Sequence, residues 1–138
     1  MDKLSWDESL ETRISEIDIR HRNFFNILKI LNDAISNGKS ALVIKDIIEG
    51  IEKYANDHIQ EEERILRKYN ILKEDHLNEH HDFRNKIKEF KEKYSILKKD
   101  RVFSQEIHDY LYGWITGHII KRDLDDIKSI RDQIKDEI

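Results

Sequence analysis

The chain has no cysteine and no proline, and glycine occurs only four times in 138 residues. Without cysteine, disulfides, thiolate zinc sites and cysteine-ligated iron–sulfur clusters are excluded, so a metal would be held by nitrogen and oxygen ligands. The same absence is consistent with a reducing compartment, and we expect a cytoplasmic protein. The scarcity of helix-breaking residues favours long, uninterrupted helices.

Long apolar runs and clustered basic residues are also missing. No segment approaches the roughly 18 consecutive apolar residues of a membrane-spanning helix, so no membrane span is expected. Basic residues are interspersed with acids and the formal net charge is −4, which argues against the basic stripe that nucleic-acid binding requires. Apolar residues almost never alternate singly, so no β-sheet is predicted. The length suits one domain.

In four segments, apolar residues recur at steps of three and four positions, which is the spacing along one face of an α-helix. A few polar residues interrupt these apolar seams. The first seam consists of Ile17, His21, Phe24, Leu28, Leu31 and Ile35. The second consists of Ile44, Ile48, Ile51, Ala55, His58, Glu62, Ile65 and Tyr69. The third consists of His76, His80, Phe83, Ile87, Phe90 and Tyr94. The fourth consists of Phe103, Ile107, Tyr110 or Leu111, Trp114 and His118.

The connections between these segments are short, so neighbouring helices should be antiparallel. Residues 37–40, Asn-Gly-Lys-Ser, end the first helix with a glycine and offer Ser40 as a cap for the second. Residues 69–75 join the second and third helices, and Asp75 is expected to cap a helix that begins at His76. Residues 95–104 join the third and fourth. The fold class predicted is an all-α, up-down-up-down four-helix bundle.

Two further segments flank this bundle, which we place at residues 17–124. Residues 1–16 form an N-terminal arm that Leu4 and Trp6 are expected to anchor against the bundle. Residues 125–138 form a helical tail whose apolar pattern comprises Leu124, Ile127, Ile130, Ile134 and Ile138. We expect the tail to pack on its own bundle, and association with a protein partner or a second copy is the alternative.

Polar side chains that bind metals interrupt the apolar seams, or lie beside them, at seven positions. These are His21, His58, Glu62, His76, His80, His118 and Asp123. Burying them without a common partner would be costly for each group, and a shared metal centre removes that cost. His58 and Glu62 are four residues apart, as are His76 and His80, so each pair projects from one helix face. Either pair alone is equally well explained by a surface pair or a hydrogen-bonded core histidine.

His118 and Asp123 are five residues apart, which places their side chains roughly 140° apart on a regular α-helix. A locally widened turn of the π type would bring them closer together, and Gly113 and Gly117 would permit such irregularity or a close backbone approach. From spacing alone, a solvated Asp123 is as good an interpretation as a ligand.

The ordered pattern of a histidine, then HxxxE, HxxxH and HxxxxD resembles the hemerythrin family, specifically its bacterial single-domain members. The resemblance covers about residues 4–124, and all seven family ligand positions are filled. Its pieces are Leu4-Ser5-Trp6, residues 17–21, residues 54–63, residues 76–83 and residues 114–123.

The resemblance implies a centre of two iron ions with an oxo or hydroxo bridge. One iron would be held by His76, His80 and His118. The other would be held by His21 and His58. The carboxylates that bridge both would be Glu62 and Asp123. Because the second iron has fewer histidines, dioxygen would bind there as a ligand, and reversible binding rather than enzymatic turnover is expected.

In this resemblance Trp114 and Ile115 line the dioxygen pocket. The family usually has leucine where Ile115 stands, and a β-branched side chain there is expected to alter access or autoxidation. His81 and His108 fall outside the ligand set, and both are expected to be exposed and to bind no metal.

Three functional classes compete: a dioxygen carrier or store, a dioxygen or redox sensor, and a di-iron enzyme acting on peroxide, nitric oxide or an organic substrate. A sensor would need a separate partner, because 138 residues leave no room for an output module. A ferritin-like oxygenase is disfavoured, since those bundles use Glu-x-x-His pairs and no histidine here follows glutamate by three residues. Zinc or manganese would fit the same ligands, and a bundle without metal is the least favoured interpretation.

Overall fold

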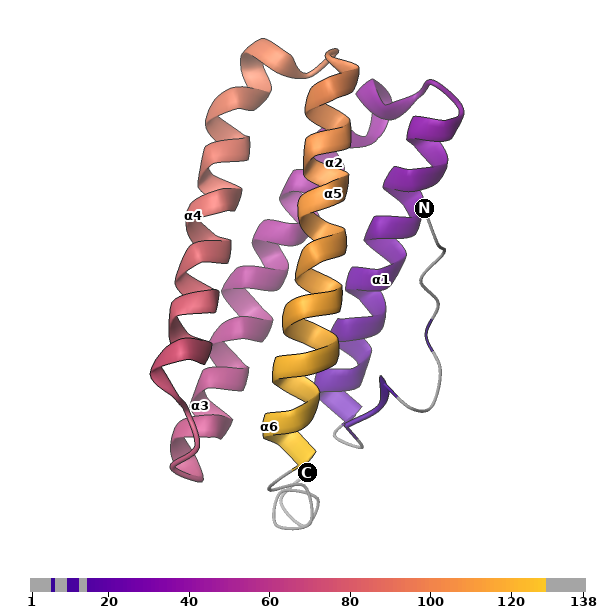
Figure 1. Cartoon of the computed structure of the whole chain (residues 1–138). Coiled ribbons are helices and arrows are strands. Elements are labelled where there is room, and N and C mark those ends of the chain that lie inside the picture. The colour runs from indigo at the N-terminus through magenta and orange to yellow at the C-terminus, as the bar shows by residue number, and fades with distance from the viewer. Residues whose placement is uncertain (1–5, 7–9, 13–14, 129–138) are drawn as a thin grey trace.

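The computed structural model describes Trp6, residues 10–12 and residues 15–128. Within these residues the chain forms four helical rods packed as an antiparallel bundle, without any strand (Figure 1). The predicted all-α bundle is therefore confirmed. Over the same residues, none of the helices is long and apolar enough to cross a membrane.

Two of the four rods are single helices and two are composite. The first rod is α1 (Ser15–Ser36) and the third is α4 (Glu74–Leu97). The second rod runs through α2 (Ser40–Tyr54), a π-helical segment η2 (Ala55–Ile59) and α3 (Gln60–Lys68). The last rod runs through α5 (Arg101–Trp114), a longer π-helical segment η3 (Ile115–Asp123) and α6 (Leu124–Lys128). Each composite rod continues in one direction through its π-helical segment (Figure 1).

The turns confirm the predicted order of the helices but neither of the two predicted caps. Gly38 has a φ of 69°, a left-handed conformation that costs glycine little. Ser40 is the first residue of α2, and no side chain caps that helix. The helix α4 begins at Glu74 after an extended Lys73, so Asp75 lies inside the first turn instead of capping it. There its charge still complements the helix dipole.

The connection between α4 and α5 is shorter than predicted, since it comprises residues 98–100 instead of 95–104. Asp100 caps α5, because its carboxylate accepts a hydrogen bond of 2.8 Å from the backbone N–H of Val102. The residues that were predicted to join the two helices are therefore mostly helical themselves: α4 continues to Leu97, and α5 begins at Arg101.

The predicted seams form the core of the bundle. Every position of the first seam is buried, and so are the other three seams except at their tyrosine positions, which are half-buried. A large apolar cluster draws on all four rods and includes four fully buried phenylalanines, Phe24, Phe83, Phe90 and Phe103. A second, smaller cluster consists of Ile17, Ile65, Leu66 and Ile127.

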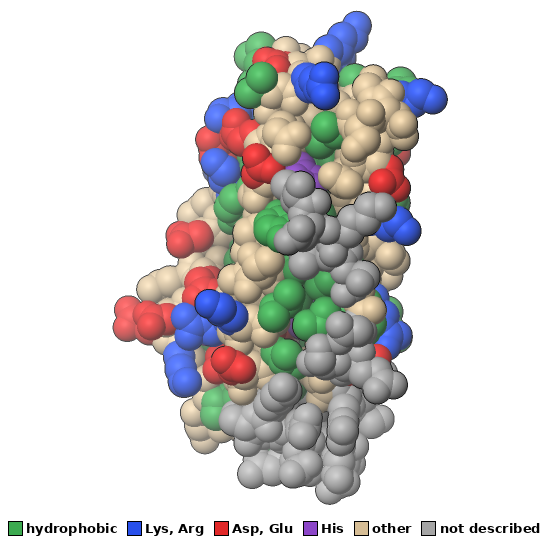
Figure 2. Space-filling model, turned by 45° about the vertical axis from the view of Figure 1, so that its right-hand side comes forward, with side chains coloured by type: hydrophobic (Ala, Val, Ile, Leu, Met, Phe, Trp, Pro, Cys, Tyr) green, Lys and Arg blue, Asp and Glu red, His purple; other side chains and the backbone are tan. Residues whose placement is uncertain are grey.

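On the face shown in Figure 2, acidic and basic side chains are interspersed, so neither sign of charge dominates it.

His108 was predicted to be exposed, and this was wrong: the side chain is only 2% exposed. The helix α5 packs against both α1 and α2, so it buries a second stripe beside the predicted seam. That stripe includes Ser104, His108 and Ile115, and it adjoins Leu111 of the predicted seam. Nδ1 of His108 lies 3.2 Å from a carboxylate oxygen of its neighbour Asp109. His81 is exposed, as predicted.

The N-terminal arm contacts α1 through Trp6, as predicted. The Trp6 ring meets Phe25 edge-on at a centroid distance of 5.4 Å, and the guanidinium of Arg22 lies over it at 5.3 Å. Farther along the arm, Thr12 donates two hydrogen bonds of 2.8 Å, from its backbone N–H and its hydroxyl, to the buried carboxylate of Asp18. The other predicted anchor, Leu4, lies outside the described residues.

The helix α6 directly continues the last rod, and its Leu124 and Ile127 are buried. The described start of the predicted tail therefore packs on its own bundle. The remaining apolar positions of that tail, Ile130, Ile134 and Ile138, lie outside the described residues, and a partner surface there stays a prediction.

Replacing Phe90 with alanine tests the core away from the polar site. Phe90 is fully buried and contacts the rings of Phe103 and Tyr110 at centroid distances of 6.1 and 5.8 Å. The cavity left by Phe90→Ala should lower the free energy of unfolding by about 3–5 kcal/mol in a urea titration. Ile96→Ala is the control, since Ile96 is 84% exposed, and it should change that energy by less than about 0.5 kcal/mol. Similar losses in the two variants would contradict this description of the core.

Candidate metal centre

The seven polar seam residues come together inside the bundle. His21, His76 and His80 lie near the starts of α1 and α4, and the other four lie in the later parts of the composite rods. Because neighbouring rods are antiparallel, all seven occupy the same end of the bundle. Each is at most 2% exposed, and they lie between the large and the small apolar clusters.

The donor atoms form two overlapping sets, and within each set they lie within 4.8 Å of one another. The larger set comprises Glu62, His76, His80, His118 and Asp123. The smaller set comprises His21, His58, Glu62 and Asp123. Only the two carboxylates belong to both sets, so the geometry is that of two neighbouring cation positions joined by Glu62 and Asp123.

The predicted widened turn between His118 and Asp123 is present as η3 (Ile115–Asp123). A π-helix places residues five apart on one face, and His118 Nε2 accordingly lies 2.9 Å from Asp123 Oδ1. A side chain at Gly113 or Gly117 would meet no atom within 4 Å, so neither glycine serves a close backbone approach. The second π-helical segment, η2, holds His58 and was not predicted.

In the larger set, the inward-facing ring nitrogens crowd the carboxylate oxygens and one another. Nε2 of His76 lies 3.0 Å from Glu62 Oε1 and 2.8 Å from Asp123 Oδ1. Nε2 of His80 lies 3.2 Å from the same Glu62 oxygen and 3.0 Å from Nε2 of His118. These contacts place three imidazole nitrogens around a single point.

Three further carboxylates orient these rings from outside. Nδ1 of His76 donates to Asp126 at 2.8 Å, that of His80 to Glu63 at 2.7 Å, and that of His118 to Glu79 at 2.7 Å. A carboxylate only accepts, so the proton of each neutral ring is held on Nδ1, and Nε2 presents its lone pair inward. Lone pairs that face one another and two carboxylates repel unless a cation lies between them.

These outer carboxylates were not predicted from the sequence, because the helices contain many acidic residues and nothing in the spacing distinguishes these three.

The half of the site with two histidines is supported differently. Nε2 of His21 lies 3.2 Å from Asp123 Oδ2, and Nε2 of His58 lies 3.5 Å from Glu62 Oε2. Both ring nitrogens of His58 are buried without a hydrogen-bond partner, as are His21 Nε2, Glu62 Oε2 and both Asp123 oxygens. Such unsatisfied groups cost about 1–3 kcal/mol each. A cation bound among them would satisfy them together, so the residues fit a metal pair.

The charges of the metal-free site are balanced by protons. Burial opposes protonation of His76 and His118, but the carboxylates of Asp123 and Glu62 outweigh it and raise their pKa values to about 10 and about 9. Burial and Asp123 oppose ionisation of Glu62, but contacts with His58, His76 and His80 lower its pKa to about 2. For His58, burial dominates and lowers the pKa. The site therefore binds positive charge in one form or another.

The chain is similar to known proteins over most of its length. The model of the Hemerythrin HHE cation binding domain matches residues 12–126. A bacteriohemerythrin of Clostridium acetobutylicum is 31% identical over 122 residues, which cover 86% of this chain and 94% of that protein. A bacteriohemerythrin of Pseudomonas paraeruginosa is 24% identical over 132 residues, which cover 95% of this chain and 84% of that protein. No solved structure gives a significant match.

Metal binding should release protons. His76 and His118 are protonated at neutral pH in the metal-free protein, since their pKa values are raised to about 10 and about 9, whereas a metal requires neutral imidazole. Loading the site at pH 7 should therefore expel about two protons from these rings. Affinity should rise steeply with pH up to about pH 9 and less steeply from there to about pH 10, where His76 loses its proton. Calorimetry in buffers of different ionisation enthalpy measures this number. His81→Gln, at an exposed position, should leave it unchanged, and loading without proton release would refute the charge balance.

Removing an outer carboxylate should weaken metal binding even though none of the seven candidate metal ligands is changed. Glu79 accepts hydrogen bonds from His118 and from Arg122, so Glu79→Gln loosens the orientation of His118. We expect the dissociation constant for ferrous or zinc ion, measured with a competing chelator, to rise about 10–100-fold. Glu89→Gln is the matched control on the same helix, because the ion pairs of Glu89 among the described residues are with Lys86 and Lys93 at the surface. Equal affinities in the two variants would argue against the orienting role.

Proposed function

Since the chain belongs to the hemerythrin family, we propose that it carries or stores dioxygen by binding it reversibly at a non-haem di-iron centre. The proposed ligands of one iron are His76, His80 and His118. Those of the other are His21 and His58, and the bridging ligands are Glu62 and Asp123. The observation that carries the proposal is the pair of overlapping donor sets that share only the two carboxylates.

The donor set supports iron. Imidazole and carboxylate suit borderline and hard cations such as iron, and a histidine-rich shell with few carboxylates favours holding dioxygen over driving a strong oxidant. When bound, an iron pair supplies electrons to dioxygen and recovers them on its release. The two carboxylates offset part of the charge of two ferrous ions, and the neutral imidazoles add none. An oxo or hydroxo bridge would complete the pair.

The asymmetry of the proposed ligands suggests where dioxygen would bind. One iron would be held by three histidines and the other by two, so an open position would lie beside His21 and His58. Trp114 and Ile115 are the proposed lining of the pocket; both are buried, and the Trp114 ring stacks on His118 at a centroid distance of 3.9 Å. These side chains would exclude water from the bound ligand, which favours reversible release over oxidation.

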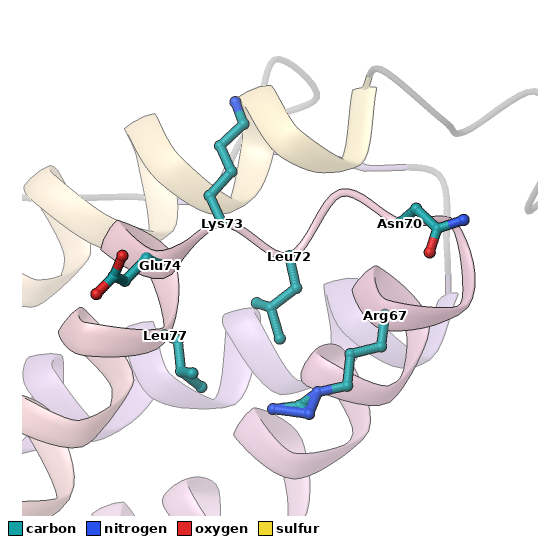
Figure 3. A pocket seen from close by; sticks show the side chains of 6 residues that line it. All are labelled: Arg67, Asn70, Leu72, Lys73, Glu74 and Leu77. Carbon is teal, nitrogen blue, oxygen red and sulfur yellow. The ribbon is translucent and has the colours of Figure 1, made fainter.

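Burial of the centre also limits what it can accept. All seven proposed ligands are at most 2% exposed, which suits a diatomic ligand better than an organic substrate. A surface pocket of about 500 Å³ lies elsewhere, at the connection between α3 and α4 (Figure 3). It is lined by Arg67, Asn70, Leu72, Lys73, Glu74 and Leu77. None of the proposed ligands lines it, so it offers no substrate site at the centre.

Reversibility is the test of carriage. The ferrous protein, prepared without oxygen, should gain a visible charge-transfer absorption in air and lose it under argon over repeated cycles. His58→Gln should abolish this cycle, because it removes a proposed ligand beside the open position, whereas His81→Gln should keep it. Immediate and permanent oxidation would instead support a sensor that acts through a partner. Sustained consumption of peroxide with an added reductant would support an enzyme.

A further inference from the structure

A layer of four aromatic side chains covers the centre on the side of the large apolar cluster. Each member lies one helical turn from a proposed histidine ligand of its own rod. Phe24 follows His21 by three residues, and Phe83 follows His80 by three. Tyr54 precedes His58 by four residues, and Trp114 precedes His118 by four. Because the rods alternate in direction, these offsets bring all four rings to one level, and all four are buried.

The rings contact one another as a continuous layer. Phe24 meets Tyr54 at a centroid distance of 4.8 Å and Phe83 at 6.0 Å. Phe83 meets Tyr54 at 5.8 Å and Trp114 at 4.1 Å. The layer therefore separates the polar centre from the apolar core above it, and any small ligand on this side of the centre would touch it.

Two members of the layer carry polar atoms that lack a well-formed hydrogen bond. The hydroxyl of Tyr54 and the indole Nε1 of Trp114 are both buried, and neither has a partner in good hydrogen-bond geometry, although the indole N–H lies close enough to the phenol oxygen to interact with it. Phenylalanine fills the other two positions of the layer, so packing alone does not require a polar atom there. Buried unsatisfied donors are rare in native proteins, and a missing ligand is a standard reason for them.

Tyr54 lies over the half of the centre that has two histidines. Its ring packs against His58 at a centroid distance of 4.9 Å with the planes inclined by 35°. A phenol is protonated at neutral pH, so its hydroxyl can donate a hydrogen bond.

We infer that the Tyr54 hydroxyl donates a hydrogen bond to a small anionic ligand at the open position beside His21 and His58, with Trp114 Nε1–H as a second donor. The inference rests on the proposed function only for the location of the open position. The ligands concerned are small anions such as azide, and dioxygen that has gained negative charge from the metals. A hydrogen bond to a charged acceptor is stronger than one to a neutral acceptor, so these donors favour such ligands over neutral diatomic molecules.

Tyr54→Phe in the iron-loaded, oxidised protein tests the inference with sodium azide as the probe. Loss of the donor should weaken azide binding about tenfold in a spectrophotometric titration. The infrared stretch of bound azide should shift in heavy water in the wild-type protein and shift less in the variant, which a purely structural role would not cause. Tyr110→Phe is the matched control, because Tyr110 is a half-buried tyrosine that contacts Phe83 and Phe90 in the core, and it should bind azide like the wild type.

The metal-free proteins provide the second measurement. Since the Tyr54 hydroxyl forms no hydrogen bond of good geometry in the fold, Tyr54→Phe should unfold at the same urea concentration as the wild type or a higher one. Unchanged azide affinity in Tyr54→Phe, or a lower urea midpoint, would overturn the inference. Azide binding does not depend on reversible carriage, so failure of the air and argon cycle would refute the proposed function and leave this test intact.

Discussion

The arrangement of this bundle depends on one electrostatic constraint: imidazole lone pairs and two carboxylates converge on a volume that water does not reach. The outer carboxylates Glu63, Glu79 and Asp126 hold protons on the far nitrogens of three rings, so the near nitrogens have nothing to donate while the rings are neutral. Only positive charge makes this arrangement stable. The metal-free fold supplies it as protons, and a family of cation-binding domains supplies it as metal.

The two π-helical segments are the backbone's contribution to the same constraint. A regular helix would point His118 and Asp123 in different directions, and η3 (Ile115–Asp123) aligns them. The segment η2 (Ala55–Ile59) lies directly before the helix that bears Glu62 and holds His58. Both composite rods thus depart from α-helical geometry where they approach the centre. Such π-helical segments are found frequently at functional sites. There the direction of the side chains matters more for function than regular α-helical hydrogen bonding of the backbone.

Much of this could be predicted from the sequence, because burial follows helical period. The seam positions are buried, and the seven polar exceptions within and beside them meet as the spacing and the family resemblance indicated. The separation of five positions between His118 and Asp123 indicated η3. His58 and Glu62 are four positions apart, which fits an ordinary α-helix, so nothing in their spacing indicated η2. The caps at Ser40 and Asp75 were misplaced, since local cap preferences are weaker than the packing that sets where a helix begins.

Features that depend on three-dimensional neighbours were beyond prediction. His108 was predicted to be exposed because it falls outside the ligand set, but α5 packs against both α1 and α2 and buries residues beyond the predicted seam. The outer carboxylates share their residue type with many solvated acids, and only the fold distinguishes them. The ring of Tyr54 packs in the large apolar cluster. That its hydroxyl lacks a well-placed acceptor becomes visible only once the surrounding side chains are placed.

The hydrogen bonds between Thr12 and Asp18 attach the arm to the first rod about one helical turn before His21. In this half of the site both ring nitrogens of His58 lack a hydrogen-bond partner, so no outer carboxylate orients that ring. The point where the arm is fixed therefore lies beside the half of the centre that has fewer supporting hydrogen bonds.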